Sequence, residues 1–112
     1  MAGDRMRSIN EALRKAISLA ISSELEDPRI GFVTVTSVDT SPDLRRARVY
    51  VSVLGDEEER EATLAGLRAA HGLLQAAIAR EARIKYTPKL TFAYDEGPER
   101  AARLSRLLET DE

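Results

Sequence analysis

The sequence predicts an α+β fold in which helices cover one face of a three-stranded sheet. Three observations indicate this: an amphipathic helical stripe near the N-terminus, a central segment with period-two hydrophobicity, and a helical connection before the last strand. The predicted order is helix, strand, strand, helix, kink, helix, strand and a short C-terminal helix. We expect one domain over residues 1–112, with its core at about residues 5–95 and a short helix and acidic tail at 98–112.

The first helix is predicted over Arg5–Glu26, because apolar side chains recur there at steps of three and four. Asp4 is the expected N-cap. Pro28 ends the helix, since it lacks a backbone donor and disfavours helical geometry at Asp27. The apolar stripe consists of Met6, Ile9, Leu13, Ala16, Ile17, Ala20, Ile21 and Leu25.

Two strands follow the first helix. Phe32–Val38 is rich in β-branched residues, and Asp39–Asp43 contains the residues that favour a turn. In the second strand, Arg46–Leu54, every odd position is apolar, so one face is buried and the other is solvated. The polar or amphipathic even positions are Arg46, Arg48, Tyr50 and Ser52. The short loop predicts an antiparallel hairpin.

A helical pattern then runs from about Glu58 to Ile84 and is interrupted at 70–72, where the sequence reads Ala-His-Gly. The third strand is predicted at Lys89–Tyr94. Because its connection from the second strand contains helix, these two strands are expected to be parallel. After Gly97 and Pro98, residues Glu99–Leu108 are predicted to form the terminal helix.

The net charge of −2 conceals an uneven distribution of charge. Residues 56–61 hold five acids and one arginine, a net charge of −4, and residues 95–112 hold six acids and three arginines, a net charge of −3. Residues 62–94 have five basic side chains and one acid, a net charge of +4. The acids therefore gather in one loop and the tail, which leaves room for a basic face elsewhere.

Composition argues against several classes of protein. There is no cysteine, which excludes disulfides and thiol chemistry and fits a reducing cytoplasm. No apolar run reaches the ~18 residues of a membrane span. The sequence shows no nucleophile–base pair, metal cluster or phosphate-binding glycine loop, so we expect no enzyme and no cofactor or metal. Nothing indicates an obligate dimer, and we expect a monomer when the protein is free.

Four motifs carry a resemblance to a known family. They are Asp27–Thr36, Ser41–Leu44, Ala47–Gly55 and Tyr86–Leu90, and the Ala-His-Gly kink stands between the last two. The order of elements resembles the type II KH fold, a two-layer sandwich, although a usual KH domain has Gly-x-x-Gly at the kink. With alanine in that place, residues 5–108 resemble the ribosome-binding factor A family of bacterial small-subunit assembly factors.

The resemblance implies a function that composition and spacing do not show. It implies binding to the 30S small ribosomal subunit and its 16S rRNA, with help in late maturation and in 5′-end processing of that RNA, especially during growth in the cold. The C-terminus ends in Leu108-Glu109-Thr110-Asp111-Glu112 and lacks the longer basic tail of some relatives. The alternative is a KH-like protein–protein adaptor without direct RNA contact.

RNA contacts require cationic donors near phosphates, and two groups of residues meet this requirement. Arg46, Arg48 and Lys89 are expected on the solvated face of the sheet, where the alternative is an ordinary exposed face. The second group surrounds the kink, where the alternative is helix solubility and favourable interaction with helix dipoles. It comprises Arg68, His71, Arg80, Arg83 and Lys85.

Ala70 and Gly72 are expected to shape the kink. A tight bend allows backbone to approach backbone, or RNA, where a side chain would collide. The alternative is a bend that serves core packing alone. On the first interpretation, Gly72→Val disrupts the bend and destabilises the protein by more than about 1 kcal/mol.

Overall fold

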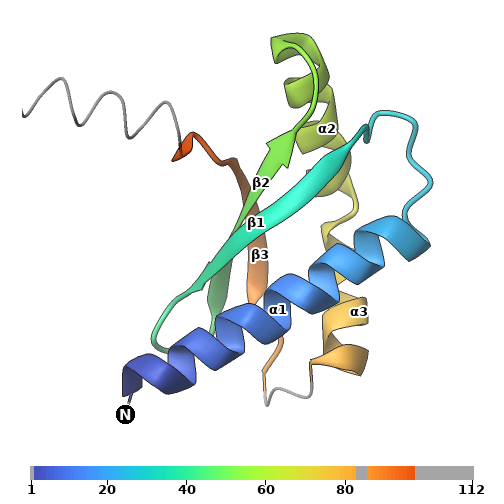
Figure 1. The fold of residues 1–112 in the computed structure, drawn as a ribbon. Helices are drawn as coiled ribbons and strands as arrows, with labels where there is room; N and C mark the ends of the chain where they lie inside the picture. The colour runs from blue at the N-terminus through green and yellow to red at the C-terminus, as the bar shows by residue number, and fades with distance from the viewer. Residues whose placement is uncertain (1, 83–85, 98–112) are drawn as a thin grey trace, which may run out of the picture.

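The computed structural model describes residues 2–82 and 86–97, and its elements follow the predicted order (Figure 1). Along the chain, the elements within these residues are α1 (Ala2–Glu24), β1 (Val33–Thr40), β2 (Arg46–Val53), α2 (Glu57–Ala69), α3 (His71–Glu81) and β3 (Lys89–Tyr94). The predicted terminal helix at 99–108 lies outside the described residues, as does the predicted end of the third helix at Ile84.

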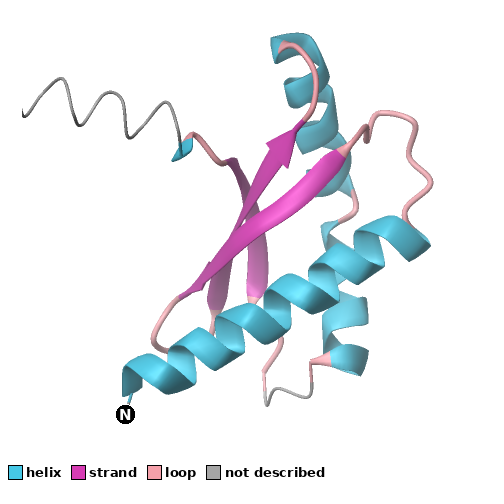
Figure 2. Cartoon of the chain, in the orientation of Figure 1, coloured by secondary structure: helices cyan, strands magenta, loops and turns pink. Residues whose placement is uncertain are grey.

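The strands β1, β2 and β3 form one twisted sheet in the order β1-β2-β3 (Figure 2). β1 and β2 are antiparallel, and β2 and β3 are parallel, which confirms both predictions. The parallel pair is possible because α2 and α3 carry the chain back between the two strands. α1 lies along β1 and contacts α3, whereas α2 and α3 both contact β3.

One hydrophobic core joins the helices to one face of the sheet. In β2 the odd positions are buried as predicted, with Ala47, Val49 and Val51 at most 1% exposed. From the helices, Leu13, Ile17, Leu67, Leu74 and Ile78 are fully buried against this face. The described helices therefore leave the opposite face of the sheet uncovered.

The first strand differs from its prediction at both ends. It begins at Val33 and continues through Asp39 and Thr40, which were expected in the turn. The Thr40 N–H donates to the side chain of Asn10 at 3.0 Å, and Thr40 faces Ala47 in the ladder, so these contacts extend the strand. An irregularity between Val35 and Ser37 shifts the alternation, a feature that local propensity does not encode.

The first helix also differs slightly from its prediction. It starts at Ala2, so Asp4 lies in the first turn of the helix and is not the N-cap. It ends at Glu24, two residues before the predicted end, and the next segment leads to a turn at Pro28 and Arg29. Its apolar stripe is otherwise as expected, because Leu13, Ala16, Ile17 and Ala20 are all buried.

Candidate nucleic-acid interface

Three cationic side chains lie on neighbouring strands at one end of the open sheet face. Arg46 is the register partner of Lys89, and Arg48 is the partner of Thr91. Arg46, Arg48 and Lys89 are all exposed because their neighbours in the alternating pattern point into the core. The sheet thus brings together cations from two strands that lie far apart in the sequence. We call Arg46, Arg48 and Lys89 the sheet cations.

No ion pair within residues 2–82 and 86–97 involves the sheet cations. Asp39 is the register partner of Arg48, but their charged groups do not form a salt bridge. The surface beside them is a shallow depression of about 370 Å³. Its lining comprises Asp39, Thr40, Ser41, Pro42, Arg46, Arg48 and Thr91. Cations that are not already paired within the chain are the donors that a phosphate backbone requires.

The turn between β1 and β2 holds this end of the sheet in place. The Ser41 N–H donates to the Arg46 carbonyl at 2.8 Å, and the Lys89 N–H donates to the Arg45 carbonyl at 2.8 Å. Leu44 has a φ of 62°, a left-handed conformation that is uncommon outside glycine. Hydrogen bonds from the Ser41 hydroxyl and then the Arg45 N–H hold the pKa of Asp43 below its usual value.

The kink between α2 and α3 is at Ala70, as predicted. The Ala70 N–H donates to the carbonyls of Gly66 and Leu67, both at 3.1 Å, and the Ala70 carbonyl accepts from the Leu74 N–H at 3.0 Å. α2 begins with a capping box between Asp56 and Glu59, but the N-cap of α3 makes no side-chain hydrogen bond. The backbone N–H groups in the first turn of α3 therefore donate no hydrogen bond to the side chain of the N-cap residue, Ala70.

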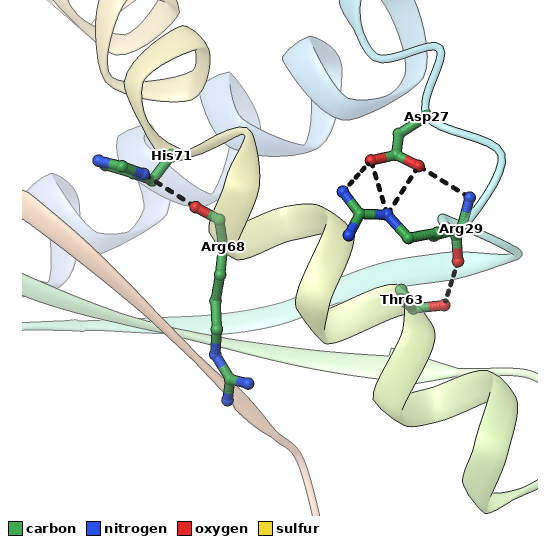
Figure 3. A network of polar contacts seen from close by, with 5 residues as sticks. All are labelled: Asp27, Arg29, Thr63, Arg68 and His71. Carbon is green, nitrogen blue, oxygen red and sulfur yellow. Dashed lines mark hydrogen bonds and ion pairs between the residues drawn. The ribbon is translucent and has the colours of Figure 1, made fainter.

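Arg68 and His71 lie on either side of the kink (Figure 3). The Nδ1 of His71 lies 2.8 Å from the Arg68 carbonyl. Because a carbonyl oxygen only accepts, this bond places a proton on Nδ1 and leaves Nε2 pointing away from it. The Arg68 guanidinium extends away from the imidazole, and its side chain is exposed. The kink therefore presents one guanidinium and one imidazole edge to the surroundings.

Gly72 does not serve the role expected of it within the chain. It lies inside α3, and a Cβ atom built there would meet nothing within 4 Å. The predicted destabilisation by Gly72→Val is therefore not supported, because no described backbone approaches this position. Gly66 is the glycine that packing requires: a Cβ there would lie 2.7 Å from Cγ1 of Ile30. Sequence reasoning did not single out Gly66.

The remaining predicted cations are Arg80, Arg83 and Lys85, and of these only Arg80 lies within the described residues. Arg80 is ion-paired with Glu24, which links α3 to the end of α1. Arg83 and Lys85 lie outside the described residues. The described structure therefore divides the predicted contact residues into the sheet cations, the Arg68–His71 pair at the kink, and one arginine used in a helix–helix ion pair.

A polar network after α1 was not foreseen (Figure 3). Arg29 binds the Asp27 carboxylate through its guanidinium, with a shortest distance of 2.6 Å, and through its backbone N–H at 2.9 Å. These bonds, the guanidinium first, hold the pKa of Asp27 below its ordinary value. Thr63 on α2 donates to the Arg29 carbonyl and accepts from the Gly31 N–H. The Asp-Pro-Arg spacing was the available signal for the ion pair.

Other kinds of site receive no support from the described residues. Across residues 2–82 and 86–97, no group of three or more His, Asp or Glu side chains is arranged to hold a metal ion. No helix in the same part of the chain combines the length and hydrophobicity of a membrane span. The arrangement is one of exposed cations on a rigid scaffold, which suits binding to a polyanion.

Relatives and solved structures agree with this architecture. Residues 5–108 match the family model described as ribosome-binding factor A. The chain is 46% identical to ribosome-binding factor A of Halothermothrix orenii, covering 96% of this chain and 88% of the relative. It is 42% identical to that of Heliobacterium modesticaldum, covering 96% and 89%.

Two solved structures have the same fold. The crystal structure of ribosome-binding factor A from Thermus thermophilus matches with a TM-score of 0.71 at 34% identity, covering 80% of this chain and 94% of that one. The solution structure of a Thermotoga maritima protein, described as a putative ribosome binding factor A, matches with a TM-score of 0.74 at 37% identity, covering 83% and 89%.

The fold and the exposed cations define a class, the α+β proteins with a KH-like two-layer sandwich. Within that class, this chain has Ala70-His71-Gly72 at the kink, where a usual KH domain has a Gly-x-x-Gly loop. The chain belongs to the ribosome-binding factor A family.

Proposed function

We propose that this protein binds the small ribosomal subunit by contacting 16S rRNA and assists its late maturation, including processing of the RNA's 5′ end. The observation that carries the proposal is the group of sheet cations on an open face, which form no ion pair within the described part of the chain. A homology model of the Thermus thermophilus ribosome-binding factor A has been fitted into a cryo-EM map of its 30S complex, and it matches this chain with a TM-score of 0.63 at 36% identity, covering 75% of this chain and 88% of that one. We propose a bacterial, cytoplasmic binding factor without catalytic activity.

The sheet cations supply the electrostatic part of the binding. Each cation that neutralises a phosphate releases counterions, so affinity falls as salt rises. Three cations on two adjacent strands contact only a few phosphates, which suits a protein with a net charge of −2. Specificity then comes from the folded shape of the RNA, as is common in RNA recognition.

The kink offers a second contact to the same partner. Arg68 supplies a positive charge. The contact between His71 and the Arg68 carbonyl is made by the Nδ1 atom, so it does not occupy Nε2. Gly72 leaves open space beside them, because nothing in the described chain approaches the position of its absent Cβ. An RNA backbone can therefore approach α3 more closely at Gly72 than at a residue with a side chain.

Co-sedimentation with purified small subunits over a salt series tests the proposal. We expect the wild-type protein to bind and Arg46→Ala/Arg48→Ala to bind more weakly, with a salt slope reduced by about 0.7–0.9 per lost phosphate contact. Arg14→Ala/Lys15→Ala on α1 removes the same charge and is the matched control, since Arg14 is already paired with Glu11. Equal loss in both variants would show a general charge effect and contradict the site.

The maturation step is tested in cells. In a strain that lacks the protein, we expect 16S rRNA with an unprocessed 5′ end to accumulate, more so in the cold, and the wild-type gene to reverse this. The Arg46→Ala/Arg48→Ala gene should reverse it only in part. A protein–protein adaptor without RNA contact would bind subunits but would not bind isolated 16S rRNA.

A further inference from the structure

Two large apolar side chains are exposed at the opposite end of β2 from Arg46. Phe32 is 81% exposed and Leu54 is 76% exposed. The Leu54 N–H donates to the Phe32 carbonyl at 3.0 Å, so the two residues are neighbours just beyond the Val33–Val53 pair. Adjacent exposed apolar side chains of this size commonly mark a contact surface. We call Phe32 and Leu54 the apolar pair.

Phe32, but not Leu54, also lines a groove between α1 and β1. The groove has a volume of about 420 Å³, and Phe32 forms part of its wall. Its lining contains two acids, Glu26 and Asp27, and no lysine or arginine.

Acidic residues follow Leu54 in the chain, and Arg29, which lines a second depression beside Leu54, is ion-paired with Asp27. Glu57 and Glu58 follow Leu54 by three and four residues, and both are exposed. No ion pair within the described part of the chain neutralises Glu26, Glu57 or Glu58. The one arginine of the 56–61 run, Arg60, lies over the Tyr94 ring with its guanidinium carbon 4.7 Å from the ring centre. A phosphate backbone would be repelled here, whereas a cationic partner would be attracted.

We propose that the apolar pair and its groove bind a basic polypeptide segment, with an apolar side chain of that segment against Phe32 and Leu54 and its lysines or arginines facing Glu26, Glu57 and Glu58. This proposal rests on the proposed function, since the segment would belong to a protein of the small subunit. The molecule then has two contact regions of opposite chemistry, one for RNA at the sheet cations and one for protein at the apolar pair.

Truncation of the apolar pair tests whether its partner is protein or RNA. We expect Phe32→Ala/Leu54→Ala to weaken binding to small subunits by about tenfold or more, as for other exposed aromatic anchors, and to leave binding to protein-free 16S rRNA unchanged. Leu19→Ala, at a 57% exposed site on α1, is the matched control and should change neither. An equal loss on protein-free rRNA would indicate base stacking and overturn the proposal, as would unchanged binding to subunits.

Removal of the acidic charges tests whether the partner group that faces them is positively or negatively charged. We expect Glu57→Gln/Glu58→Gln to weaken subunit binding at low salt if the facing partner is basic, and Asp4→Asn/Glu81→Gln, at exposed positions on α1 and α3, to have a smaller effect. Tighter binding after the first double substitution would mean that the facing group is a phosphate and would overturn the proposal. If the wild-type protein binds no subunits at all, the proposed function itself fails, which is a different result.

Discussion

At the scale of single residues, the two glycines on the helices after β2 have opposite roles. Gly72 is exposed and has open space where a Cβ would stand, so Gly72→Ala removes the conformational cost of glycine in a helix. We expect this change to raise the free energy of unfolding by about 0.5–1 kcal/mol, measured by urea denaturation. Any loss of subunit binding in the same variant would then come from the interface and not from unfolding.

Gly66→Ala is the matched comparison for Gly72→Ala. Its new methyl group would lie 2.7 Å from Cγ1 of Ile30, so the loop after α1 would have to shift. We expect a loss of about 1–3 kcal/mol, the usual cost of overpacking. If both alanine variants changed stability in the same direction, the assignment of open space at Gly72 and close contact at Gly66 would be wrong.

Thr63 illustrates a role that depends on one hydroxyl group. The side chain is 1% exposed and bonds the backbone at both Arg29 and Gly31. Thr63→Val keeps the shape but leaves these two backbone groups without their partner, so we expect a loss of about 1–3 kcal/mol in the free energy of unfolding. Thr63→Ser retains the hydroxyl and should cost less; a serine variant as unstable as the valine variant would assign the effect to packing instead.

At the scale of elements, the pair Asp27–Arg29 stabilises the connection between α1 and β1 in a pH-dependent way. The pKa of Asp27 is lowered from its ordinary value of 3.8, chiefly by the Arg29 guanidinium. Its contribution is therefore present above about pH 4 and is lost as the pH falls through the lowered pKa. We expect Asp27→Asn to be less stable than wild type near neutral pH and equally stable in acid, measured by denaturation across pH. A difference that stayed constant with pH would contradict this.

The elements also show what the sequence could and could not predict. The alternation in β2 and the stripe in α1 follow directly from side-chain hydrophobicity, so the structure confirms both. The extension of β1 to Thr40 depends on a hydrogen bond from the Thr40 N–H to the side chain of Asn10, thirty residues earlier, and local patterns carry no such information. The break at Ala70 was predictable, whereas the need for glycine at Gly66 arises only when the loop at Ile30 packs against α2.

The same distinction applies to the candidate site. Alternation alone placed Arg46, Arg48 and Lys89 on the solvated face, because burial of the odd positions in β2, and of Leu90 and Phe92 in β3, leaves no other direction for them. The pairing of Arg80 with Glu24 could not be seen, since it joins two helices across fifty-six residues of sequence. Phe32 was expected to start a strand, and only its exposure in the folded protein shows that the core does not use its ring.

At the scale of the whole molecule, the sheet cations and the apolar pair stand at opposite ends of β2. Residues 46 and 54 are eight positions apart, which corresponds to about 26 Å along a strand. Sites this far apart without shared partners usually act independently. The two proposed regions should therefore contribute separately to subunit binding, the first through charge and the second through apolar contact.

A double-mutant cycle tests this independence. We expect the binding free energy lost in Arg46→Ala/Arg48→Ala and in Phe32→Ala to add, within about 0.5 kcal/mol, when the substitutions are combined. Binding to small subunits by fluorescence anisotropy at two salt concentrations provides the four affinities needed at each. Higher salt should reduce the effect of the arginine substitutions and leave that of Phe32→Ala nearly constant, because only the former acts through screened charge. A combined loss well below the sum would mean that one region binds only after the other, so that β2 would carry a single coupled interface.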